Sequence, residues 1–192
     1  MVESELNRYR KVVKAKDGSV VVLRPMVVTD RDGLVALFRQ LPEDSRRLLK
    51  HDVTDESLVA SWADELDYSR VFPLVAQVGD EIVADATLHR YPGTSTRHVG
   101  QIRIVTGPSI QGKGLGTIIL KELVDLAEKL GLEQLKAEIP LGPDAARPAL
   151  RSFERMGFRQ EAVFKDYFKS AEGGYHDVAV LFLVVKEHWK EF

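Results

Sequence analysis

The sequence predicts one α/β domain in which a mixed sheet of about seven strands lies between about four helices on its two faces. Two observations predict this class. Apolar runs of strand length follow one another closely in the first half of the chain, whereas helical patterns separate them in the second half. The 192 residues, of which 44% are hydrophobic, are enough to bury one core. We expect a polar lead-in over residues 1–17 and a single domain over residues 18–192.

The first half of the chain predicts one strand, two amphipathic helices and a hairpin. A β-branched run over residues 20–23 is typical of a strand. Thr29, followed three residues later by Asp32, matches a helix-capping pattern that precedes a helical stripe of apolar residues. A second stripe predicts a helix from Thr54. Two later apolar runs flank Gly79-Asp80, a pair that suits a two-residue turn and therefore predicts a hairpin.

The second half predicts a long helix and a short helix between strands. Residues 99–106 form the fourth strand, with Gln101, Arg103 and Val105 on one side of it. Apolar residues at helical spacing then continue to Gly131, which supplies the stop of the long helix. The later elements expected are a fifth strand at 135–139, a short helix from Arg147 to Gly157, a sixth strand from Phe158 and an apolar last strand at 178–185.

Composition and charge exclude several classes of function. A net charge of −2 and a pI near 6.2 argue against a nucleic-acid partner, which needs uncompensated Lys and Arg. The absence of cysteine excludes disulfides, a thiolate nucleophile and Cys-ligated zinc. No window approaches the apolar length that a membrane span needs, and the first residues lack a secretory pattern. We expect a soluble cytoplasmic protein with no metal and no membrane partner.

The most informative feature is the glycine-rich turn over residues 111–116, between the fourth strand and the long helix. Backbone N–H groups at a helix start have no helical partner, and glycines let an anion approach them, so this order predicts a phosphate-binding site. A P-loop would need Ser or Thr where Gly114 stands, and a dinucleotide-binding turn would need glycine in place of Ile119. The remaining match is the pattern Q-x-x-G-x-G, filled by Gln111, Gly114 and Gly116.

With this turn the chain resembles the GNAT N-acetyltransferase superfamily, whose members bind the acetyl-CoA pyrophosphate there. The resemblance implies a three-layer fold with a mostly antiparallel sheet that is splayed between its fourth and fifth strands. It also implies acetyl-CoA as the acyl donor, without a metal. The further motifs that carry it are Leu23-Arg24-Pro25 with Asp30, the Gly79-Asp80 hairpin, Pro108, Arg155-Met156-Gly157-Phe158 and, more loosely, residues 41–46, which are similar to the branch associated with protein lysine acetylation.

The resemblance also implies which residues hold the acetyl-CoA. The pantetheine arm is expected in the gap between the two splayed strands, and the pyrophosphate on the glycine-rich turn. Phe153 stands where relatives often carry a tyrosine acid, and Ala146 stands where they often carry an asparagine that contacts the cofactor arm. The cofactor residues implied are Ile104, Val105, Thr106, Gln111, Gly112, Lys113, Gly114, Leu115, Gly116, Thr117 and Phe153.

The sequence does not identify the catalytic groups. Many relatives place a glutamate general base on the fourth strand, and the matching position here is Gln101, which cannot take a proton. The missing tyrosine acid matters less, because a CoA thiol with a pKa of about 8.5 leaves tolerably well as thiolate. The other candidates for base or acid are His89, His98, Glu81 or Asp85 acting through water, and Tyr167 or Tyr175.

These features favour an acetyl-CoA-dependent N-acetyltransferase that moves acetyl directly to a primary amine of a small molecule, a protein lysine or a protein N-terminus. A non-catalytic acyl-CoA-binding regulatory module is the alternative, because Gln101 and Phe153 stand where catalytic groups often lie. The acidic residues around the two N-terminal helices could attract a cationic amine or form a solvated outer face. The aromatic residues His188, Trp189 and Phe192 leave open whether a homodimer forms.

Overall fold

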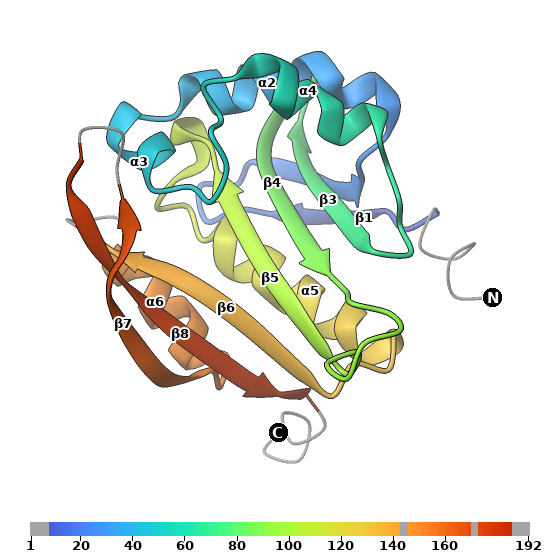
Figure 1. Ribbon diagram of the computed structural model, residues 1–192. Helices are drawn as coiled ribbons and strands as arrows, with labels where there is room; N and C mark the ends of the chain where they lie inside the picture. The colour runs from blue at the N-terminus through green and yellow to red at the C-terminus, as the bar shows by residue number, and fades with distance from the viewer. Residues whose placement is uncertain (1–7, 143–145, 170–172, 186–192) are drawn as a thin grey trace.

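The computed structural model describes residues 8–142, 146–169 and 173–185. Within these ranges one sheet of eight strands has the order β1-β2-β3-β4-β5-β6-β8-β7 (Figure 1). Neighbouring strands pair antiparallel except β5 and β6, which are parallel because a helix crosses between them. The strands are β1 (Lys11–Lys14), β2 (Val20–Pro25), β3 (Val71–Val78), β4 (Glu81–His89), β5 (Val99–Thr106), β6 (Gln134–Leu141), β7 (Arg159–Lys169) and β8 (Tyr175–Val184).

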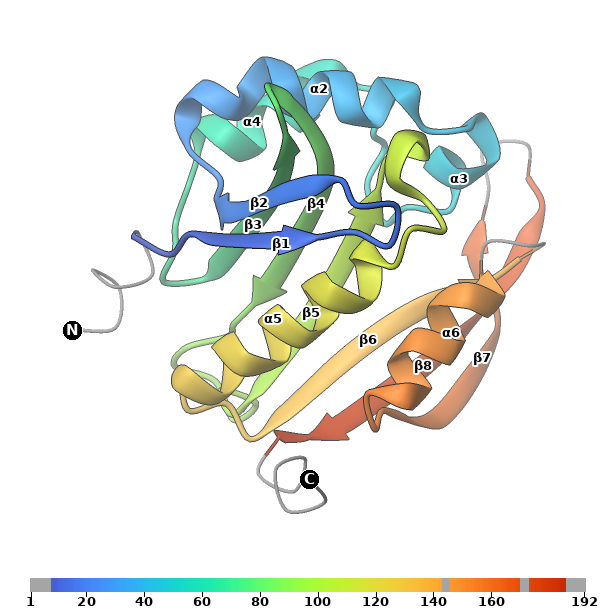
Figure 2. The ribbon, with the colours of Figure 1, turned by 180° about the vertical axis from the view of Figure 1, so that it is seen from behind.

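Helices cover both faces of the sheet, as predicted (Figures 1 and 2). Strand alternation divides the core between these faces: Leu74 of β3 packs with α5, whereas the next residue, Val75, packs with α2 and α4. None of the described helices is long and apolar enough to cross a membrane. The helices are α2 (Arg31–Gln40), α3 (Glu43–Arg47) and α4 (Glu56–Asp64) on one side, and α5 (Leu115–Lys129) and α6 (Ala146–Arg155) on the other.

Strand β1 and the short helix α3 are additions to the elements that the sequence predicts. Residues 11–14, which we expected in a polar lead-in, pair antiparallel with β2. The strand is held onto α5, because the Lys11 ammonium forms an ion pair with Glu122 and the Tyr9 hydroxyl donates to the same carboxylate at 2.6 Å. Four residues with lysine at both ends give too short a pattern to predict, so the edge strand depends on these long-range contacts.

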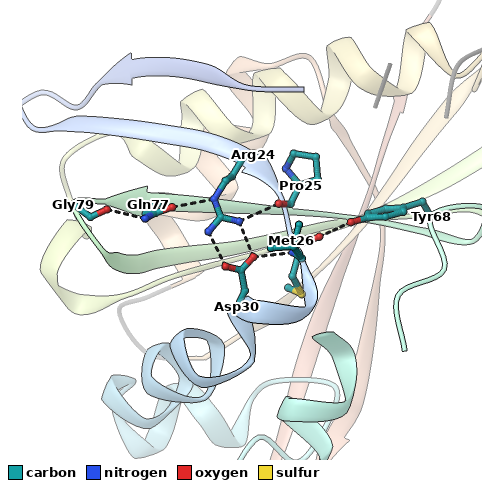
Figure 3. A network of polar contacts seen from close by, with 8 residues as sticks. Arg24, Pro25, Met26, Asp30, Tyr68, Gln77 and Gly79 are labelled. Carbon is teal, nitrogen blue, oxygen red and sulfur yellow. Dashed lines mark hydrogen bonds and ion pairs between the residues drawn. The ribbon is translucent and has the colours of Figure 1, made fainter. Parts of the chain in front are cut away.

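A half-buried ion pair anchors the turn between β2 and α2 (Figure 3). The Arg24 guanidinium donates two parallel hydrogen bonds to Asp30, of 2.6 and 2.7 Å, and a third of 2.9 Å to Gln77 on β3. Such a two-pronged pair is stronger and more directional than a single contact. Arg24 therefore holds the Asp30 carboxylate, and α2 begins at Arg31 without a side-chain cap. The prediction that Thr29 caps this helix is wrong.

The strands β5 and β6 part halfway along their length (Figure 1). They pair only over four residues each, from Val99 with Gln134 to Ile102 with Ala137. Beyond this point β5 continues to Thr106 beside β4, and β6 continues beside β8. The splay that we predicted between the fourth and fifth strands is therefore confirmed, and it lies between β5 and β6 because β1 adds one strand to the count.

Candidate functional site

The glycine-rich turn forms an uncapped helix start. Gly112 and Gly114 have φ angles of +75° and +79°, in the left-handed region that favours glycine. Gly114 is the N-cap of α5 and has no side chain that could cap this end. The N–H groups of the first helical turn, at Leu115, Gly116 and Thr117, therefore have no helical acceptor. Because a Cβ at Gly112 would meet only open space, an anion can approach this turn closely.

Neighbouring residues hold the side chains of the turn. Lys113 Nζ lies 2.7 Å from Asp17 Oδ2, and this hydrogen bond is the main reason why the pKa of Asp17 falls to about 2. The N–H of Lys16 donates to the Lys113 carbonyl at 2.9 Å. Gln111 donates from Nε2 to the Thr106 carbonyl at 3.3 Å. The turn is thus tied to the β1–β2 hairpin and to the end of β5, which fixes its amides beside the gap.

The end of β5 offers main-chain groups to the gap. Ile104, Val105 and Thr106 pair with residues 84–86 of β4, and no described residue of β6 pairs with them. Because a strand turns its N–H and C=O groups alternately to its two sides, some of these groups face the gap. The unpaired main-chain groups of β5 therefore come shortly before the helix start in the chain, at the end of the strand to which Gln111 binds.

Phe153 lies in the core where α5 meets α6. Its side chain is 8% exposed and packs edge-to-face on Phe158, with the ring centroids 4.9 Å apart. Beside it, the Thr117 hydroxyl donates to the Ser152 hydroxyl at 3.1 Å and links the two helices. Packing is therefore the role that the structure gives Phe153, and its contact with the cofactor stays a prediction. Ala146 is the first residue of α6.

A polar set of side chains lies on the sheet face that carries α2 and α4. Val75 packs in the cluster formed by these helices, and the strand register pairs it with Asp85, which in turn pairs with Val105. Residues that pair directly share one face of a sheet, and every second residue along each strand does the same. On β4 and β5 the polar set therefore consists of Asp85, Thr87, His89, Gln101 and Arg103, and Lys136 and Glu138 continue the same face onto β6.

Asp85 is the most unusual member of the polar set. Its side chain is buried, and Oδ1 has no hydrogen-bond partner among the residues that the structure describes. Burial alone raises the pKa of this carboxyl to about 7. Its partner in the register is Val105, at the end of β5 that borders the gap. A carboxyl whose pKa lies near neutrality is suited to take up a proton at physiological pH.

His89 and Gln101 face each other across β4 and β5. His89 Nε2 lies 3.0 Å from the Thr87 hydroxyl, and its pKa falls to about 4, first because of burial and then because of the nearby Arg103 charge. Gln101 is 6% exposed, and its Oε1 accepts a hydrogen bond of 3.0 Å from the Tyr91 hydroxyl. His89 is therefore a weak base near neutral pH, and the Gln101 amide already has a partner.

The other predicted candidates lie outside the polar set. His98 precedes β5 at the end where β5 and β6 are still paired, roughly 20 Å along the strand from Ile104. Glu81 begins β4 and is exposed, with Gln40 donating to it at 3.4 Å. The remaining two, Tyr167 and Tyr175, are exposed on β7 and β8, on the far side of β6 from β5. His188, Trp189 and Phe192 lie outside the described residues.

The contact of Arg103 with His51 was missed by the sequence analysis. Arg103 Nη1 lies 3.2 Å from Nε2 of His51, which lies between α3 and α4 and is 52 residues earlier in the chain. The His51 ring also contacts Trp62 of α4, with the centroids 5.7 Å apart. Strand alternation indicated on which side of β5 Arg103 lies, but no local pattern could have indicated its partner.

Most of the acidic residues around the N-terminal helices already have ion-pair or hydrogen-bond partners. Ion pairs join Glu43 to Arg47, Glu56 to Arg39 and Asp64 to Arg31. Turn hydrogen bonds from Thr54, Ser57 and Ser69 lower the pKa values of Asp52, Asp55 and Asp67. This supports the solvated outer face rather than a region that attracts a cationic amine. No group of three or more potential metal ligands occurs among the described residues.

Comparisons with known proteins point to one family. The model of the acetyltransferase (GNAT) family matches residues 36–158. The ribosomal protein bS18-alanine N-acetyltransferase of Salmonella typhimurium is 30% identical over 78 residues, 41% of this chain and 49%, or about half, of that relative. The GNAT domain of S. lividans PAT superposes with a TM-score of 0.75 at 21% identity, over 92% of this chain and 97% of that domain. The structure of yncA from Salmonella typhimurium with its cofactor acetyl-CoA superposes with a TM-score of 0.71 at 18% identity, over 86% of this chain and 94% of that chain.

Proposed function

The chain belongs to the GNAT acetyltransferase family, and on that premise we propose that it transfers acetyl from acetyl-CoA directly to a primary amine of a small molecule or a protein. The observation that carries the proposal is the juxtaposition of two features at the end of β5. One is the uncapped, glycine-built start of α5, and the other is the gap between β5 and β6. A diphosphate joined to a slender amide-containing arm is complementary to both features at once.

The residues present fit acetyl-CoA. The first-turn amides of α5 would hold the pyrophosphate, since they lack acceptors and Gly112 leaves open space before them. Lys113 would add a positive charge that Asp17 already partly balances. The main chain of residues 104–106 would hold the pantetheine arm in the gap. When bound, acetyl-CoA supplies an activated acetyl group and a thiol that leaves as thiolate.

We assign the general base to Asp85. An amine with a pKa of about 10.4 is only about one part in a thousand neutral near pH 7.4, so the acceptor must lose a proton before it can react. Asp85 lies opposite Val105, on the strand next to the one that borders the gap. Its pKa of about 7 leaves an appreciable fraction of carboxylate at neutral pH to accept that proton. Main-chain N–H groups of β5 would stabilise the negative charge that develops on the carbonyl oxygen.

The relatives support an amine acceptor but do not choose between small molecules and proteins. The relative from Salmonella typhimurium is named for the alanine of a ribosomal protein, and the match covers about half of it. A second candidate function is a non-catalytic acyl-CoA-binding module. Gln101 and Phe153 favour it, because they stand at positions where relatives often carry catalytic groups. The Gln101 amide is hydrogen-bonded to Tyr91, and the Phe153 ring is packed in the core.

Calorimetry followed by a thiol-release assay tests the proposal. We expect acetyl-CoA to bind the purified protein with measurable heat, and a panel of primary amines to release CoA above the buffer rate. Binding without release for every amine would favour the regulatory module. No binding of acetyl-CoA would contradict both functions.

A further inference from the structure

Arg103 occupies the point where β5 and β6 part. The last residue pair of the two strands is Ile102 with Ala137, so Arg103 is the first β5 residue that borders the gap. Its side chain lies on the face of the polar set, and its strand partner is Thr87. Arg103 is therefore placed where the gap opens, on the same face of the sheet as Asp85.

Arg103 forms no direct ion pair in the part of the chain that the structure describes, and Glu138 acts on its charge only from beyond ion-pair distance. Among the described residues, no carboxylate lies within ion-pair distance of this guanidinium, which instead contacts the ring nitrogen of His51. The guanidinium is partly buried, and burial lowers the pKa of Arg103. A charge that is removed from water without a counterion costs free energy. An anionic ligand would supply the missing counterion.

The charged groups around Arg103 are of both signs, and the acid among them is already paired with a lysine. Burial and the Arg103 charge lower the pKa of His51, so this ring is largely neutral at pH 7. Lys50 lies close enough to lower the pKa values of both His51 and His89. Glu138, the nearest acid on β6, is bound to Lys136 at 2.6 Å. The charge of Glu138 is thus shared with Lys136, which leaves the Arg103 guanidinium able to bind an anion.

We propose that the acceptor is a small amine that carries a carboxylate, and that Arg103 binds this carboxylate while Asp85 faces the amine. This inference rests on the proposed function. Asp85 pairs with Val105 and Thr87 pairs with Arg103, so Asp85 and Arg103 are diagonal neighbours on adjacent strands. Diagonal neighbours lie about 7–8 Å apart, a separation that a molecule with a few bonds between amine and carboxylate spans. The planar guanidinium offers the paired donors that a carboxylate fits.

Matched acceptors test the inference. We compare 4-aminobutyrate with its carboxamide and L-lysine with cadaverine, and we measure CoA release for each. The carboxylate-bearing member of each pair is expected to have the higher kcat/KM. In Arg103→Gln the preference should fall by about 10- to 100-fold, mostly through KM, while the Kd of acetyl-CoA stays unchanged. Arg103→Lys should keep part of the preference, because it keeps the charge but loses the fork.

Arg97→Gln is the matched control, since it removes the same charge from an exposed loop and should leave the preference intact. Equal kcat/KM within each pair would overturn the inference. So would a loss of acetyl-CoA affinity in Arg103→Gln without a change in acceptor preference, because Arg103 would then serve the cofactor. A higher kcat/KM for a peptide with an acidic residue beside its N-terminus than for every small amine would also overturn the inference. The acceptor would then be a protein rather than a small molecule.

Failure of the proposed function is distinguishable from failure of this inference. If acetyl-CoA binds but no amine releases CoA, the function is contradicted. The carboxylate site can still be tested by the shift in Tm that 4-aminobutyrate causes. We expect this shift in the wild type and in Arg97→Gln and not in Arg103→Gln; its absence from all three would overturn the site itself.

Discussion

The cofactor half and the acceptor half of the proposed site are built from different parts of the polypeptide. Main-chain groups make the cofactor half, from residues 104–117, one continuous segment. Side chains make the acceptor half, and they come from β4, β5 and the segment between α3 and α4. The first half therefore depends on backbone conformation and the second on side-chain chemistry. Substitutions in one half should therefore change cofactor binding, and substitutions in the other should change catalysis or acceptor preference.

The largest effect is expected from Asp85→Asn, which removes the proposed base without changing the shape of the side chain. A general base typically contributes about 10²- to 10⁴-fold in rate, so kcat should fall by that range while the Kd of acetyl-CoA is unchanged. In the wild type the rate should also rise with pH through about 7, the pKa of Asp85, and this limb should be lost in the variant. Steady-state kinetics from pH 5.5 to 9 measure both effects.

Asp125→Asn is the control for this substitution, because Asp125 also has a buried oxygen without a partner and a raised pKa but lies on α5. Its kcat should match that of the wild type. Unchanged kcat in Asp85→Asn, or an equal loss in the two variants, would remove Asp85 from the proposed mechanism.

The same Asp85→Asn change should make the folded protein more stable at neutral pH, although it lowers kcat. The pKa of Asp85 is raised from 3.8 to about 7 in the folded state, so the folded state binds the proton more tightly than the unfolded state. The wild type therefore loses stability relative to the variant as pH rises from about 4 to about 7, by about 4 kcal/mol at most. Urea unfolding of both proteins at pH 4.5 and 8 measures the difference. A difference that does not change with pH would contradict the raised pKa.

In the cofactor half, Gly114→Val should weaken binding of acetyl-CoA and leave acceptor preference intact. A branched residue in the left-handed region costs about 1–3 kcal/mol, and relief of this strain would shift the amides away from the diphosphate. We expect a Kd about 10- to 100-fold higher by calorimetry. Gly93→Val imposes the same left-handed backbone strain in a surface loop, at φ +77° and without the Lys16 side chain that a Cβ at Gly114 approaches, and it should leave the Kd unchanged. Equal Kd values for the two variants would count against the turn as the binding site.

The smallest effect is expected from Thr106→Val at the end of β5. The proposed contacts there use the main chain, and the Thr106 carbonyl, rather than its hydroxyl, is the group that accepts from Gln111. The Kd of acetyl-CoA should change by less than about twofold, since the variant keeps the backbone and the branched shape. A change as large as that of Gly114→Val would mean that side chains also build the cofactor half.

The same contrast explains how much of the site could be predicted from the sequence. The turn at residues 111–116 and the strand before it are local patterns, and both were predicted where the structure has them. The splay followed from the family resemblance rather than from periodicity. The contact of Arg103 with His51 and the missing partner of Asp85 depend on strand register and on segments far apart in the chain, so no local pattern contains them.

The fold shows the same limit on a smaller scale. Strand β1 is four residues long and is held by contacts of residues 9 and 11 with Glu122, more than one hundred residues away. The Thr29 cap was expected from a valid local pattern, but Arg24 binds the neighbouring Asp30 carboxylate and the helix begins at Arg31. Local rules predicted the longer elements, whereas tertiary contacts created the short edge strand β1 and decided where α2 begins.

Backbone amide NMR with two ligands tests the central claim most directly, that the first-turn amides of α5 bind the diphosphate of acetyl-CoA. We predict that CoA shifts the amide signals of Gly112, Leu115, Gly116 and Thr117, and that pantetheine, which lacks the diphosphate, shifts only signals of β5 beside the gap. Saturating CoA that leaves these four amide signals in place, or pantetheine that shifts them equally, would contradict the claim.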